Sequence, residues 1–144
     1  MNPIEQAEKY FAQGFACSQA LLAAFAPELN LPQETALKIA DGFGGGIGRK
    51  GLICGAVSGA VMVLSQKFGR TDPKDQTAKD KLNQKIQQFI KKFQSQHQSI
   101  NCNDLLGLDL STDQGLKTAS QKNLFKTQCP NYVNSAAQIL TQLL

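Results

Sequence analysis

Four cysteines are the residues of this 144-residue chain whose chemistry could carry a function. Cys17, Cys54, Cys102 and Cys129 lie far apart along the chain, and no two are spaced as C-x-x-C. The C-x-x-C spacing is typical of thioredoxin-type redox sites, zinc ribbons and covalent haem attachment, so its absence argues against these three kinds of site. Any site that the cysteines share must therefore be assembled by the fold, and the sequence ranks none of the possible disulfide pairings.

Each cysteine lies at or near the predicted start of a helix or turn. Free N–H groups and the helix dipole at such a position favour the thiolate. We predict Cys54 as the attacking thiolate of a thiol–disulfide exchange, with Cys17, Cys102 or Cys129 as its resolving partner. Four thiolates could equally hold Zn²⁺ or an iron–sulfur cluster. Buried free cysteines are also common as inert packing residues.

A glycine-rich segment, Gly42–Gly59, surrounds Cys54 and holds most of the chain's twelve glycines. Gly51, Gly55 and Gly59 recur at every fourth residue, which places them on one face of a predicted helix. A face without side chains lets another backbone or a bulky cofactor come close. We therefore predict these three glycines as a close-approach face, for tight helix packing or for binding a cofactor.

Part of this segment, Gly46–Gly51, matches the dinucleotide-binding pattern G-x-G-x-x-G. That pattern binds phosphate when it follows a strand in a βαβ unit. Here the preceding residues have a helical pattern and no second strand is predicted. An anion held at Gly44–Gly51, near Arg49 and Lys50, is the weaker alternative that the residues allow.

The rest of the chain predicts an all-α fold. No stretch alternates with period two, and apolar residues recur at helical spacing. We expect a single-domain helical bundle of about five to seven helices over residues 1–144. The predicted helix starts are Asn2-Pro3, Cys17, Leu31-Pro32, Ile53, Thr71-Asp72-Pro73, Asp113 and Cys129-Pro130, with a short helical turn after Asn101.

Composition excludes several classes of function. The net charge of +4 is mild, and acids are interleaved with the lysines of residues 74–92, so no nucleic-acid partner is expected. The longest apolar run, Leu52–Leu64, is short of the ~20 residues that span a bilayer. No secretory signal is evident, which predicts a cytoplasmic location where thiols stay reduced. The one histidine, His97, is expected to face solvent, so hydrolytic catalysis has little support.

One motif resembles a known family. Residues Cys54–Gly59 read CGAVSG, a full CGAxxG, and the other cysteines flank it in CSQALLAAF, CNDLLGLDL and CPNYVNSAAQIL. This arrangement resembles the C_GCAxxG_C_C family of redox-active proteins, bacterial and archaeal chains of about this length. A related domain occurs in split-Soret cytochromes, which carry haems and a nonhaem iron centre.

The resemblance implies a redox role for Cys17, Cys54, Cys102 and Cys129. Their partner would be a redox protein or a small-molecule electron donor or acceptor. An iron–sulfur centre is compatible with it, whereas covalent haem is not, because C-x-x-C-H is absent. The resulting hypothesis is a cysteine-dependent oxidoreductase or an iron–sulfur electron carrier. The alternative is a structural zinc-binding or helix-docking module without redox activity.

Overall fold

The computed structural model describes all 144 residues and is helical throughout, which confirms the all-α prediction. Seven α-helices have eight residues or more, and two, α6 and α8, are shorter. Two 3₁₀ helices, η1 (Ala26–Leu29) and η2 (Asp41–Phe43), follow α2 and α3. The α-helices are α1 (Pro3–Ala12), α2 (Cys17–Phe25), α3 (Gln33–Ala40), α4 (Gly55–Phe68), α5 (Gln76–His97), α6 (Cys102–Leu106), α7 (Asp113–Gln121), α8 (Leu124–Thr127) and α9 (Cys129–Leu143).

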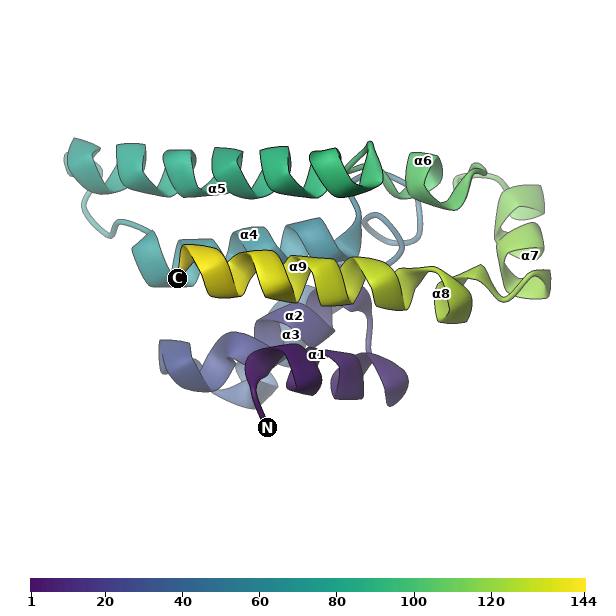
Figure 1. The fold of residues 1–144 in the computed structure, drawn as a ribbon, viewed down its shortest axis with the longest axis horizontal. Helices are drawn as coiled ribbons and strands as arrows, with labels where there is room; N and C mark the ends of the chain where they lie inside the picture. The colour runs from purple at the N-terminus through teal and green to yellow at the C-terminus, as the bar shows by residue number, and fades with distance from the viewer.

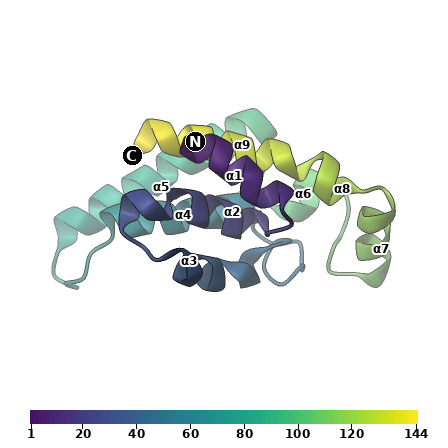
Figure 2. The ribbon, with the colours of Figure 1, turned by 90° about the horizontal axis from the view of Figure 1, so that it is seen from below.

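The helices are arranged in three tiers, as Figure 1 shows. The long helix α5 lies along one side, α4 and α9 run through the middle, and α1, α2 and α3 form the opposite side. Helices α7 and α8 lie at one end, beyond the start of α9, and Figure 2 shows α7 projecting from that end. The last helix, α9, packs against the first, α1.

Helix α2 is the centre of the core. Every one of its residues, from Cys17 to Phe25, is buried, and it packs against α1, α3, α4 and α9. The Gln-rich α5, by contrast, buries only Leu82, Phe89 and Phe93 and leaves its polar face in water. No helix combines the length and apolarity needed to cross a membrane.

Two of the three predicted close-approach glycines let α4 pack directly against α2. A Cβ added to Gly59 would lie 2.8 Å from the carbonyl oxygen of Ser18, and one added to Gly55 would lie 3.2 Å from the amide nitrogen of Ser18. The α2 backbone packs on this face at Gly59, while Gly55 also lines the cavity described below. Gly51 is not part of this face, because α4 begins only at Gly55 and Gly51 adopts a positive φ in the preceding loop.

Two helix starts differ from the sequence-based prediction. Ile53 does not begin α4, because it pairs with Asn101 in an isolated antiparallel bridge. Asp72 does not begin α5, because its carboxylate accepts the amide of Lys74 in a turn. Asp75 caps α5 instead, by accepting the amide of Ala78. The first difference arises from a bridge to a distant segment, and the second from a local side chain that satisfies the backbone before a helix can form.

Substitution of Gly59 tests the contact between α2 and α4. Alanine there would gain ~1 kcal/mol of helix propensity, but its Cβ would overlap the α2 backbone. We expect Gly59→Ala to lower the free energy of unfolding by a net ~1–3 kcal/mol, measured by urea denaturation. Gly42→Ala is the control, since a Cβ there meets nothing within 4 Å and φ is not positive. Equal stability of the two variants would contradict the packing role.

Candidate functional site

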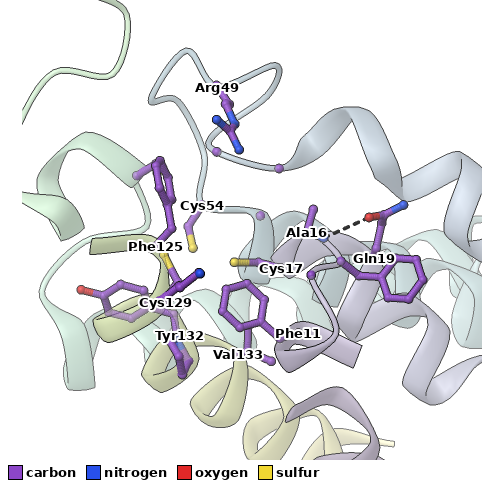
Figure 3. Close-up of a pocket in the computed structure, with 18 of the residues that line it drawn as sticks. Phe11, Ala16, Cys17, Gln19, Arg49, Cys54, Phe125, Cys129, Tyr132 and Val133 are labelled. Carbon is purple, nitrogen blue, oxygen red and sulfur yellow. Dashed lines mark hydrogen bonds between the residues drawn. The ribbon is translucent and has the colours of Figure 1, made fainter. Parts of the chain in front are cut away.

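The four cysteines gather around one cavity of about 790 Å³. Cys17, Cys102 and Cys129 are the first residues of α2, α6 and α9, and Cys54 immediately precedes α4. Figure 3 shows the sulfur atoms of Cys17, Cys54 and Cys129 pointing toward one another. Each cysteine is at least nine-tenths buried. The fold thus assembles the shared site that the spacing of the cysteines requires.

Cys17 is positioned by hydrogen bonds at the start of α2. The Gln19 side-chain oxygen accepts the amide of Ala16 at 2.9 Å, while its NH₂ group donates to the Leu37 carbonyl at 3.0 Å. The Ser18 hydroxyl donates to the Ala40 carbonyl at 2.7 Å and is fully buried. These bonds fix the first turn of α2 against α3, which holds the Cys17 sulfur in the cavity.

Cys54 and Cys102 are positioned as a pair by the bridge between Ile53 and Asn101. The amide of Cys54 donates to the Ile100 carbonyl at 2.8 Å, and the amide of Cys102 donates to the Leu52 carbonyl at 2.6 Å. Successive side chains of an extended segment point to opposite faces. The two cysteines therefore leave the bridge on the same side, toward the cavity.

Burial keeps Cys54 and Cys102 protonated. Desolvation raises the pKa of Cys54 to about 11, although the amides of Ala56 and Val57 donate to its sulfur and lower the pKa in part. Desolvation, together with the neighbouring thiols of Cys54 and Cys129, raises the pKa of Cys102 to about 12. Both groups are thiols at neutral pH, so the geometry does not favour Cys54 as the attacking thiolate.

Cys129 is the thiol whose ionised form the site favours. A hydrogen bond from the Cys17 thiol lowers the pKa of Cys129 and outweighs the effect of burial. The same interaction, with burial, raises the pKa of Cys17 well above its usual value. Where Cys129 is ionised, the two sulfurs would form a thiol–thiolate pair, with Cys17 as the donor and Cys129 as the acceptor.

A single-ion metal site is not formed by these side chains. No group of three or more His, Cys, Asp or Glu side chains lies close enough to hold one metal ion. The four thiols line one cavity, but they do not lie close enough together to surround one ion, as tetrahedral zinc requires. The geometry therefore gives no support to the predicted structural zinc site.

The glycine-rich loop before Cys54 forms part of the cavity wall and does not present a phosphate cradle. The amides of Gly48, Arg49, Gly51 and Leu52 all donate to carbonyls within the loop. Because these N–H groups are occupied, the G-x-G-x-x-G match offers no row of free donors to a nucleotide. Gly51 is required there for packing, since a Cβ would collide with the side chain of Asn103.

Comparison with known proteins identifies the family. A family model described as "Putative redox-active protein (C_GCAxxG_C_C)" matches residues 15–143. The chain belongs to the C_GCAxxG_C_C family. No curated protein and no solved structure matches it. All four cysteines of the cavity lie within the matched residues.

Several aromatic residues of this family member line the cavity without having been predicted from the sequence. Phe11, Phe15, Phe125 and Tyr132 form its apolar walls. The Tyr132 hydroxyl donates to the Leu105 carbonyl at 2.9 Å, which ties α9 to α6. Tyr132 follows Cys129 by three residues on α9, and this helical spacing was the one signal in the sequence that could have placed it in the site.

His97 is only partly exposed, because one side of its ring packs on aromatic neighbours that the sequence-based expectation of a solvent-facing residue did not include. Its ring packs 4.7 Å from that of Phe93 and 5.0 Å from that of Tyr132. Its Nε2 lies 2.9 Å from the Ser135 hydroxyl, and burial lowers its pKa. His97 supports the cavity wall from behind Tyr132, because the last turn of α5 packs on α9.

The pKa order of the thiols predicts which one reacts first. At pH 7 we expect iodoacetamide to modify Cys129 before the other three, as read by peptide mass spectrometry, because the thiolate is the nucleophile. Cys17→Ala removes the hydrogen-bond donor and should move the pH midpoint of Cys129 alkylation upward. Cys102→Ala is the control and should leave that midpoint in place. A midpoint insensitive to Cys17 would contradict the thiol–thiolate pair.

The raised pKa values of Cys54 and Cys102 also predict how stability depends on pH. Above pH 9 these thiols ionise in the unfolded chain, whereas the folded protein keeps them protonated to about 11 and 12. The free energy of unfolding should therefore fall as pH rises from 9, by up to ~1.4 kcal/mol per pH unit for each thiol. Urea denaturation between pH 8 and pH 10.5 should show that the free energy of unfolding falls less steeply for the Cys54→Ser/Cys102→Ser variant than for the wild-type protein. If the free energy of unfolding depended on pH equally in the two proteins, the result would be inconsistent with two buried thiols.

Proposed function

We propose that this protein is a thiol–disulfide redox protein in which Cys129 is the attacking thiolate and Cys17 the resolving thiol. The observation that supports it is the juxtaposition of these two sulfurs, which lie at the starts of α2 and α9 and point toward one another inside a cavity that a small molecule could enter. The family's description as redox-active agrees with it. The cytoplasmic location predicted from the sequence would supply the reducing conditions that such a pair needs.

The exchange proceeds in two displacements. The Cys129 thiolate attacks one sulfur of a disulfide substrate, forms a mixed disulfide and releases the other sulfur as a thiolate. The Cys17 thiol then loses its proton to the departing group and attacks the Cys129 sulfur, which forms the Cys17–Cys129 disulfide and releases the second thiol. The protein loses two electrons and the substrate gains them.

The chain's two thiol pairs differ in their suitability for this step. The rate at which a cysteine attacks a disulfide depends on the fraction of it that is thiolate. A thiol with a pKa of 11 or 12 is almost wholly protonated at neutral pH. Cys54 and Cys102 are therefore assigned no attacking role. They lie against the reactive pair, where neutral thiols supply a weakly polar wall that adds no charge beside the Cys129 thiolate.

An iron–sulfur cluster is the second candidate, and one observation favours it: all four cysteines line the same cavity. Cys17, Cys54, Cys102 and Cys129 would be the ligands, and the cluster would supply one-electron transfer. Thiols bound to iron are deprotonated, so the high pKa values of Cys54 and Cys102 would oppose assembly. Gly55 lines this cavity, whereas Gly59 is covered by α2. We therefore rank the dithiol function first.

Paired double variants test the dithiol function. Cys54→Ser/Cys102→Ser keeps the proposed pair, and Cys17→Ser/Cys129→Ser keeps the same number of thiols in the other pair. Each is equilibrated without oxygen in buffers of reduced and oxidised dithiothreitol. We expect the first variant to form one intramolecular disulfide, identified by peptide mapping, with a single two-electron transition.

The control variant should remain a dithiol over the same range of potentials. Disulfide formation in both variants alike, or in the control alone, would contradict the assignment of Cys17 and Cys129. Bound iron in wild-type protein purified without oxygen, lost on substitution of any one cysteine, would favour the cluster instead.

A further inference from the structure

The cavity carries a charged and aromatic rim that the exchange chemistry does not use. Phe125 lies at its edge, and the Arg49 guanidinium carbon stands 5.3 Å from the centre of the Phe125 ring. Lys126, the next residue after Phe125, also lines the cavity and is exposed. Figure 3 shows Arg49 and Phe125 on the same side of the cysteines. Two cations and an aromatic ring therefore flank one part of the opening.

Neither cation is neutralised by an acid. The one ion pair of the structure joins Lys38 and Glu34 on the surface of α3. Two acids do line the cavity, on other elements: Glu8 belongs to α1 and accepts a hydrogen bond from Asn134, and Asp41 begins η2. Arg49 and Lys126 thus have no carboxylate partner within 4 Å. Their charges are therefore available to bind an anionic group of a ligand.

We infer that the cavity takes an anionic disulfide of low molecular weight, whose negatively charged group lies at Arg49 and Lys126 while its sulfurs reach Cys129. This inference rests on the proposed function and names its substrate class. A volume of about 790 Å³ matches that of a small-molecule site and is too small to admit a folded partner protein. The aromatic walls suit the apolar part of such a molecule.

The disulfide substrate itself accepts the two electrons that the protein loses. The disulfide R–S–S–R accepts two electrons and leaves as R–S⁻ and R–SH, while the Cys17 thiol and the Cys129 thiolate become a disulfide. The Cys17 proton ends on the second departing sulfur. No metal, other oxidant or further reductant takes part in this half-reaction. Arg49 and Lys126 act by positioning the anion and by attracting it toward the cavity.

Two aromatic disulfides that differ in charge provide the test. The probe 5,5′-dithiobis(2-nitrobenzoate) carries two carboxylates, and 2,2′-dithiodipyridine is neutral at pH 7. Stopped-flow absorbance gives the rate of each with reduced Cys54→Ser/Cys102→Ser protein at low ionic strength. The readout is the ratio of the anionic to the neutral rate, so that changes in thiol pKa, which affect both probes, cancel.

We expect Arg49→Gln and Lys126→Gln each to lower this ratio about three- to tenfold, because each removes one attractive charge from the site. Added salt should shrink the difference, since it screens exposed charges. Lys122→Gln is the matched control: the same charge is removed from an exposed lysine at the end of α7 that does not line the cavity. Its ratio should stay at the value of the parent protein.

The outcomes separate the inference from the proposed function. A ratio unchanged by Arg49→Gln and Lys126→Gln, or lowered equally by Lys122→Gln, overturns the anionic substrate, while a Cys17–Cys129 disulfide formed with 2,2′-dithiodipyridine would still support the exchange. Failure of both probes to produce that disulfide overturns the exchange and the inference together. Formation of the Cys17–Cys129 disulfide with the neutral probe in each variant shows that the fold is intact.

Discussion

The direct contact between the backbones of α2 and α4 is the constraint on which the site depends. Gly59 brings α4 so close that a single added carbon would lie 2.8 Å from the Ser18 carbonyl. Helix α2 can be buried along its whole length because such small residues let its neighbours surround it. Since Cys17 opens α2 and Cys54 precedes α4, the same contact sets how the two sulfurs meet in the cavity.

Two opposing effects then decide which sulfur ionises most readily. Position at a helix start favours the thiolate in all four cases, but burial favours the neutral thiol. For Cys54 burial prevails: a rise of its pKa from 9.0 to about 11 corresponds to roughly 3 kcal/mol against ionisation. For Cys129 the hydrogen bond from Cys17 prevails over burial. Helix position alone is therefore a poor guide to thiol reactivity, and the partner of the sulfur decides.

Local signals in the sequence predict the helices well and the site only in part. Asn2 caps α1 through the Asn2–Glu5 capping box, Gly69 ends α4, and Cys129-Pro130 begins α9, as their residue types indicate. That the cysteines must meet also follows from the sequence, because they share no local motif. Their pairing does not, since it depends on the Ile53–Asn101 bridge and on α9 packing against α2, contacts between residues far apart in the chain. The partial burial of His97 was missed for the same reason: its packing partner, Tyr132, lies on another helix.

The proposed disulfide would couple the redox state to the stability of the fold. A bond between Cys17 and Cys129 closes a loop that includes most of the chain, and the loss of unfolded-state entropy for a loop near this length stabilises the folded form by ~4–5 kcal/mol. By linkage, a fold that is stabilised by its disulfide also makes that disulfide harder to reduce. The hydrogen bond that stabilises the Cys129 thiolate acts in the opposite direction, because it favours the reduced form. The reduction potential of the pair is thus set by the balance between a long-range effect of chain topology and a local bond between two sulfurs. Only the local bond can be tuned by a side chain of the cavity without changing the fold.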